Sequence, residues 1–228
     1  MPTREKARCE QHDALCSPDA MQTTGPDLRS ETANAGLVFL GYQAKRRWSA
    51  VATFSPAGDK RVEVHTVSEC VVPPVQPSRE RWDFNRATCY ERPELAEALV
   101  PEDWKNEWGM LAFWLDPATD IGGEFVRVDL TELFPDSLPA LPAEGGPSAW
   151  EVLGWDVVAL EASNLGFGCA PLSCNYMAKE EAVNQFCLMD NHAEARRVVS
   201  RFNAEQPEPG RYFAVRIARR FPAGHPTC

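Results

Sequence analysis

The sequence lacks several features that would assign a protein to a common class. No apolar run approaches the roughly 20 residues that a helix needs to cross a bilayer. The first residues, Met1 to Lys6, are not followed by the apolar stretch of a secretory signal. The glycine-rich patterns G-x-G-x-x-G and G-x-x-x-x-G-K-[ST] are also missing. We therefore expect a cytoplasmic protein without membrane association, and the absent glycine patterns exclude the common nucleotide-binding loops.

Histidine and basic residues are scarce. The 228 residues include 4 His and 23 Lys and Arg against 33 Asp and Glu, a formal net charge of -10. His65 falls opposite the apolar face of an alternating strand, where we expect an exposed residue. No histidine has a recognisable carboxylate partner in the sequence, so general acid–base catalysis has no support here. The excess of negative charge predicts no binding to nucleic acid, because phosphates would be repelled.

The acidic residues concentrate in one part of the chain. Residues 91–161 contain 16 acidic and 3 basic side chains. Such a segment can present an acidic face to a basic protein partner, although ordinary solvated surface is the alternative. Two tryptophans within it could anchor a partner or pack inward onto the sheet. The candidate binding residues are Glu94, Glu97, Glu102, Asp103, Trp104, Glu107 and Trp108.

A second acidic group, Asp116, Asp120 and Glu124, lacks the ligand spacing of a calcium loop. We expect these three side chains to be solvated loop carboxylates.

Cysteine is more abundant than in an average intracellular protein, with eight residues, yet too sparse for a disulfide scaffold. Four candidate ligands follow the spacing C-x4-C-x12-C-x4-H: Cys169, Cys174, Cys187 and His192. Thiolate and imidazole groups at such spacings can close around a structural zinc ion. Two alternatives stay open. In one, the cysteines are buried reduced side chains; in the other, Cys169 or Cys174 is a nucleophile with His192 as its base.

The organisation of the chain follows its polarity. Residues 1–35 are polar and without apolar periodicity, which predicts a disordered tail. We expect residues 36–228 to form a single globular domain, with residues 137–148, rich in proline and glycine, as a candidate subdivision. Apolar or alternating runs predict strands at 37–42, 48–54, 61–67, 110–115 and 124–130, and proline in the first turn predicts a short helix at 93–99.

The last third has the clearest pattern. It predicts a strand at 155–160, a loop at 164–175, a helix at 178–189, a second helix capped by Asn191 and Glu194, and a strand at 212–217. In the second helix the apolar side chains fall on one face: Ala195, Val198, Val199 and Phe202. The whole pattern predicts an α+β fold with mainly antiparallel sheet and a C-terminal strand-loop-helix-helix-strand unit.

These observations favour a non-enzymatic module, of an inhibitory or immunity-like kind, that presents an acidic surface to a basic protein. The alternative is a zinc- or thiol-dependent enzyme centred on Cys169, Cys174, Cys187 and His192. In the first case no cofactor is expected, and in the second a zinc ion is the candidate.

Overall fold

The computed structural model describes residues 36–47, 49–50, 62–68, 71, 89–104, 107–129, 150–160 and 169–220. The predicted tail at 1–35 and the proline- and glycine-rich segment at 137–148 lie outside these residues, as does most of the strand expected at 48–54. Within the described ranges, no helix is long and apolar enough to cross a membrane.

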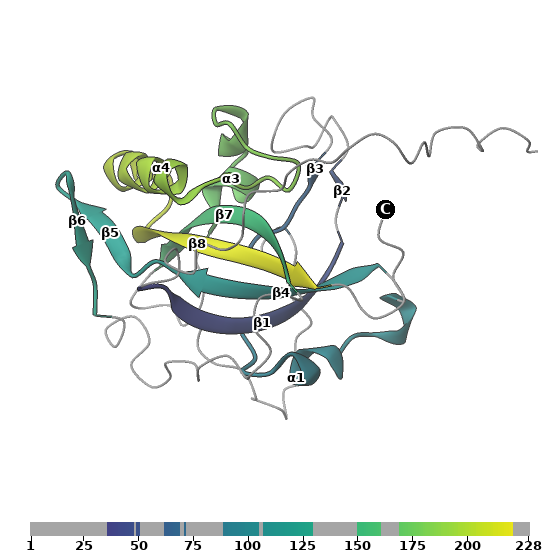
Figure 1. Cartoon of the computed structure of the whole chain (residues 1–228). Coiled ribbons are helices and arrows are strands. Elements are labelled where there is room, and N and C mark those ends of the chain that lie inside the picture. The colour runs from purple at the N-terminus through teal and green to yellow at the C-terminus, as the bar shows by residue number, and fades with distance from the viewer. Residues whose placement is uncertain are drawn as a thin grey trace, which may run out of the picture. The chain divides into compact units, whose positions relative to one another are not determined.

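Four antiparallel strands form the main sheet, in the order β1-β4-β8-β7 (Figure 1). They are β1 (Val38–Arg46), β4 (Trp108–Leu115), β7 (Glu151–Leu160) and β8 (Arg211–Arg220). Two short pairs accompany the sheet: β2 (Ser49–Ala50) with β3 (Val62–Glu63), and the hairpin of β5 (Ala118–Ile121) with β6 (Glu124–Arg127). The helical elements are α1 (Pro93–Glu97), η2 (Glu102–Trp104), α3 (Pro171–Cys174), η4 (Met177–Lys179) and α4 (His192–Glu205). This arrangement is the predicted α+β fold with mainly antiparallel sheet.

Helix α4 covers one face of β7 and β8 (Figure 1). Its first turn is capped as predicted, because the side chain of Asn191 accepts a hydrogen bond of 3.0 Å from the Glu194 amide. The four apolar residues on the predicted face of the helix are fully buried: Ala195, Val198, Val199 and Phe202. They pack against side chains of β7 and β8 such as Val157 and Ala214. Burial of this face explains why the helix forms here.

The opposite face of β7 and β8 belongs to a second apolar cluster. Val158 and Leu160 of β7 share it with Phe213 and Val215 of β8 and with Val67 from the segment after β3. Side chains alternate along a strand, so Asp156, two residues before Val158, projects toward this same face. A carboxyl group therefore enters a predominantly apolar interior.

Glycine occupies a constrained position in each edge strand. Gly154, at an irregularity in β7, has φ +142°, and a Cβ there would lie 2.6 Å from the carbonyl oxygen of Met189. Gly41 of β1 has φ +124° and would place a Cβ 2.6 Å from the carbonyl oxygen of Tyr90. Backbone hydrogen bonds join Trp155 to Met189 beside the first glycine. These close approaches let loop segments cover both edges of the sheet.

The helix expected at 178–189 does not form. After η4 the chain makes a turn organised by Asn184, whose side-chain oxygen accepts hydrogen bonds from the amides of Phe186 and Leu188. Its amide nitrogen donates to the Leu153 carbonyl oxygen at 2.8 Å. Cys187 then adopts a left-handed conformation with φ 63°. The prediction was wrong because an Asn side chain offers the backbone partners that compete with a helix.

The expectation that His65 is exposed was also wrong, since only 5% of the residue is accessible. The strand ends at Glu63, and the His65 amide donates to the Phe186 carbonyl oxygen at 3.3 Å. The ring lies 3.1 Å from a guanidinium nitrogen of Arg219 and 3.1 Å from a carboxylate oxygen of Glu63. Burial lowers the pKa of His65, while the Glu63 carboxylate opposes the shift. His65 is therefore buried in a network with Glu63 and Arg219, which the alternation of apolar and polar residues in the sequence did not predict.

Candidate functional site

Cys169 and Cys174 are held at the end of β7. The carbonyl oxygen of Cys169 accepts a hydrogen bond of 3.0 Å from the Ala159 amide, which fixes the chain where the strand ends. Pro171 then begins α3, a single turn that ends at Cys174. The Cys174 amide donates to the Ala170 carbonyl oxygen at 2.9 Å, closing that turn. Both cysteines are half-buried. The turn therefore folds the two thiols of C-x4-C back toward each other.

Hydrogen bonds converge on the sulfur of Cys174. The Ser68 hydroxyl lies 2.9 Å from Cys174 Sγ, and Cys169, Ser173 and the backbone of Ala170 are further partners of this sulfur. The bond from Cys169 lowers the pKa of the Cys174 thiol most. Burial opposes the shift, and the bonds from Ser68, Ala170 and Ser173 lower the pKa further, to about 6. The surroundings of Cys174 thus favour the thiolate, which is the nucleophilic form of cysteine.

Asp156 is a buried carboxyl group within the electrostatic range of this sulfur. Its Oδ2 accepts a hydrogen bond of 2.7 Å from the Thr66 hydroxyl, and its Oδ1 accepts one of 2.9 Å from the Val157 amide. Burial raises the pKa of Asp156 to about 7, and the nearby Cys174 charge raises it too, while the hydrogen bonds oppose the shift. Two negative charges in this space repel each other. The surroundings therefore favour the negative charge on Cys174 and the proton on Asp156.

Lys45 organises the turn that carries Thr66 and Ser68. This residue of β1 is only 3% exposed, and its ammonium group donates to the carbonyl oxygens of Thr66 at 2.7 Å and Ser68 at 2.9 Å. The Ser68 amide donates to Thr66 Oγ1 at 3.0 Å, which directs the Thr66 hydroxyl proton to Asp156. The two hydroxyls of this turn therefore contact two different ionisable groups: Thr66 contacts Asp156, and Ser68 contacts Cys174.

Cys187 lies close to the same groups but differs in chemistry. The residue is 2% exposed, and burial raises the pKa of its thiol to about 12, with the Asp156 and Cys174 charges adding to the shift. At neutral pH it is a protonated, apolar side chain within the cluster that packs against α4. Its environment therefore contrasts with that of Cys174, fewer than 15 residues earlier in the chain.

His192 contacts Asp116 rather than the three cysteines. Its Nε2 lies 2.7 Å from Asp116 Oδ2, and its ring stacks on Trp155 with 4.3 Å between the ring centroids. Arg196 donates to the same carboxylate oxygen at 2.9 Å. Asp116 is 4% exposed, so the expectation of a solvated loop carboxylate was wrong for this residue. Burial raises the pKa of Asp116, but its hydrogen bonds with His192, the Ala118 amide and Arg196 outweigh burial and hold the pKa below its ordinary value.

The four ligands of the predicted zinc site are therefore divided. Cys169 is a hydrogen-bonding partner of Cys174, and the charge of Cys174 influences Cys187, whereas His192 contacts Asp116. Among the residues that the structure describes, no group of three or more His, Cys, Asp or Glu side chains is arranged to hold a metal ion. The zinc site stays a prediction, which elemental analysis of the purified protein would test.

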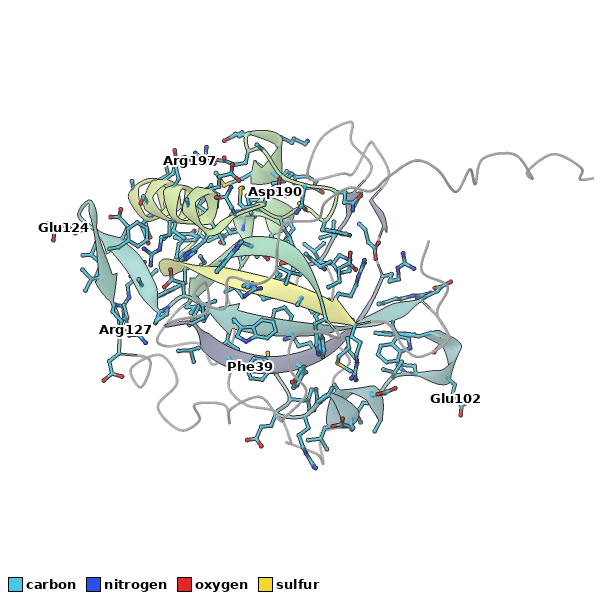
Figure 2. All side chains as sticks on the ribbon, viewed as in Figure 1. Phe39, Glu102, Glu124, Arg127, Asp190 and Arg197 are labelled. Atoms are coloured by element: carbon cyan, nitrogen blue, oxygen red, sulfur yellow. The ribbon has the colours of Figure 1, made fainter. Side chains whose placement is uncertain are left out.

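The residues of the predicted acidic face lie around α1, η2 and the start of β4. Glu94, Glu97, Glu102, Asp103 and Glu107 are all exposed, and Glu102 points outward in Figure 2. Glu107 is paired with Arg46 at 2.7 Å. The two tryptophans do not accompany these carboxylates on the surface. Trp108 is 7% exposed and lies in an apolar cluster with Tyr42 and Met110, against which the half-buried Trp104 packs.

Sequence reasoning missed five residues of the site around Cys174: Lys45, Thr66, Ser68, Asp156 and Ser173. One signal was available for Asp156: an ionisable residue in the apolar run Trp155-Asp156-Val157-Val158 must be buried or mark an irregularity. Comparison with protein-family models, with curated proteins and with solved structures finds no match for this chain.

Proposed function

We propose that this protein performs thiol-dependent covalent chemistry, with Cys174 as the nucleophile. The observation that carries the proposal is the convergence of hydrogen bonds from Ser68, Cys169, Ala170 and Ser173 on Cys174 Sγ. An inert core cysteine has no need of such partners, whereas a reactive one requires its thiolate to be stabilised near neutral pH. The half-buried position of Cys174 leaves it closer to solvent than Cys187.

Asp156 supports this assignment as the second ionisable group of the site. Burial raises the pKa of Asp156, whereas hydrogen bonds lower the pKa of Cys174, so the negative charge is favoured on the sulfur rather than on the carboxyl group. The hydroxyl of Thr66 and the amide of Val157 fix the carboxyl group in place. His192 has no part in this mechanism, since its Nε2 is bound to Asp116.

Alkylation as a function of pH tests the proposal. The protein is treated with iodoacetamide between pH 4 and pH 10, and each cysteine is quantified by peptide mass spectrometry. We expect the rate at Cys174 to rise with an inflection near pH 6, and Cys187 in the same digest to remain protected. S68A should move the inflection of Cys174 upward, while the control S200A on α4 should not.

Two outcomes would contradict the proposal. One is an inflection of Cys174 at the ordinary value near 8.5, which would show a thiol without stabilised charge. The other is a Cys174 that stays unmodified in the folded protein at every pH.

A second candidate function is binding of a basic protein through the acidic residues of 91–107. It is favoured by one observation: Glu94, Glu97, Glu102 and Asp103 are exposed within ten residues of chain. Because Trp108 is buried, this proposal now rests on the carboxylates rather than on aromatic anchors. A partner captured by affinity purification should associate more slowly with E102K/E107K and at higher salt, and E124K on the β5–β6 hairpin is the matched control.

A further inference from the structure

Cys169 and Cys174 are two thiols at the ends of one turn of chain. Cys169 is a hydrogen-bonding partner of the Cys174 sulfur, and its bond is the largest influence that lowers the pKa of that thiol. The chain between them is one closed turn, in which the Ala170 carbonyl oxygen accepts from the amides of both Ser173 and Cys174. Neither cysteine is in a disulfide in this structure. Two half-buried thiols that one closed turn brings to the same place need little rearrangement to be joined.

We propose that Cys169 and Cys174 form a reversible dithiol–disulfide pair that exchanges electrons with a disulfide substrate. The inference rests on the proposed function in one respect, that Cys174 is the attacking thiolate. Cys169 is then the resolving cysteine, which displaces the substrate from Cys174. The proposed function by itself requires only Cys174 and no second cysteine. The chemical class of the substrate follows, since a thiolate with a second thiol beside it is suited to disulfides rather than to substrates that leave a stable acyl or alkyl group.

The exchange proceeds in two balanced steps. Cys174 Sγ attacks one sulfur of the substrate disulfide, an S–S bond forms between them, and the other half of the substrate leaves as a thiolate. Cys169 Sγ then attacks Cys174 Sγ, and the second half of the substrate leaves and takes up the proton released by Cys169. The two cysteines together lose two electrons, and the substrate disulfide is reduced to one thiolate and one thiol. A dithiol such as dithiothreitol reverses both steps.

The surroundings select Cys169 over Cys187 as the resolving cysteine. Cys187 is almost fully buried, and burial raises the pKa of its thiol to about 12, so the thiol is protonated at neutral pH. A protonated thiol is a poor nucleophile. Cys187 is also fixed in a turn, because its amide donates to the Asn184 carbonyl oxygen at 3.1 Å. Cys169, by contrast, is half-buried like Cys174 and is a hydrogen-bonding partner of its sulfur.

Oxidation would also change the state of Asp156. A disulfide has no negative charge, so the repulsion that Cys174 exerts on the Asp156 carboxylate would disappear. The pKa of Asp156 should therefore be lower in the oxidised protein than in the reduced one. The redox state of the cysteine pair is thereby coupled to a proton on a residue of the central sheet.

The experiment uses the full chain and glutathione disulfide as the probe. Reduced protein is incubated with the probe, trapped with acid, alkylated and mapped by mass spectrometry. We expect the wild type to form an internal Cys169–Cys174 disulfide that dithiothreitol removes. C169S should instead accumulate glutathione on Cys174, at least tenfold more than the wild type. C169A repeats this test with a different side chain, and C187S, as the control, should behave as the wild type.

The outcomes separate this inference from the function on which it rests. In one outcome, the alkylation rate of Cys174 rises near pH 6, but the wild type retains glutathione on Cys174 as C169S does. This would refute the reversible pair and leave the proposal that Cys174 is the nucleophile intact. A Cys174–Cys187 disulfide would equally overturn the role of Cys169. If Cys174 shows an ordinary inflection, the proposed function itself fails.

Discussion

The Thr66 hydroxyl donates a hydrogen bond of 2.7 Å to the carboxyl group of Asp156, 90 residues later in the chain. Two residues after Thr66, the Ser68 hydroxyl reaches the sulfur of Cys174, 106 residues away. One short turn, held by the buried ammonium of Lys45, therefore connects both acids of the candidate site.

Replacement of Asp156 by Asn should change how stability depends on pH. Since folding raises the pKa of Asp156 from 3.8 to about 7, the folded state binds more protons than the unfolded state in this window. The wild type therefore loses stability as pH rises through it. From pH 4 to pH 6, the difference in stability between D156N and the wild type should shift by about 2–3 kcal/mol in favour of D156N, at roughly 1.4 kcal/mol per pH unit.

Urea unfolding at several pH values measures this difference, and D116N is the matched control. The pKa of Asp116 is lowered on folding, so its contribution is present above its ordinary pKa and is lost as pH falls through its folded pKa. D116N should accordingly be destabilising at pH 6. A difference between D156N and the wild type that is independent of pH would show that Asp156 ionises normally.

Thr66→Val should remove a bond that favours the Asp156 carboxylate. The side chain keeps its shape, but Asp156 and the Ser68 amide each lose a partner, which should destabilise the fold by about 1–3 kcal/mol. The pKa of Asp156 should rise further, and the loss of stability with pH should extend to higher pH. Thr66→Ser retains the hydroxyl and should restore the wild-type pH profile. Titration of the Asp156 carboxyl group by NMR checks both variants.

Gly154→Ala should be strongly destabilising. Its backbone φ of +142° is one that L-residues rarely adopt, and the new methyl group would meet the Met189 carbonyl oxygen at 2.6 Å. We expect a loss of more than about 2 kcal/mol, from backbone strain together with separation of the Trp155–Met189 pairing. Gly122→Ala is the control, because φ is also positive there, +66°, but no atom lies within 4 Å of the added carbon. Equal losses in the two variants would contradict the close approach.

Val198→Asp should largely unfold the protein. Val198 is fully buried between α4 and the sheet, where an unpaired carboxylate has no partner among the apolar side chains around it. A loss of more than about 4 kcal/mol is expected in thermal or urea unfolding. Ala193→Asp adds the same group to an exposed position in the first turn of the same helix, where negative charge is favourable, and should change stability little. Wild-type stability of V198D would refute the packing of this face.

The elements governed by local signals could be predicted from the sequence. The cap at Asn191, the apolar face of α4 and the proline at the start of α1 are consequences of neighbouring residues, and the structure confirms each of them. The segment 178–189 shows the limit of this reasoning. Its composition suits a helix, but Asn184 bonds to the Leu153 carbonyl oxygen and to the amides of its own turn, and these bonds depend on where β7 lies.

The sequence alone determined the fold class, the cysteine spacing and the acidic segment, because periodicity, spacing and composition are properties of nearby residues. Tertiary structure decided the chemistry of the site. The pKa of Cys174 is lowered and that of Cys187 is raised, and Ser68 and Asp156, which the fold brings from distant parts of the chain, contribute to these shifts. The same holds for His192, which the sequence offered as a ligand and which the fold places on Asp116. A pKa is set by charges, donors and burial in three dimensions, and the order of residues does not specify these until the chain has folded.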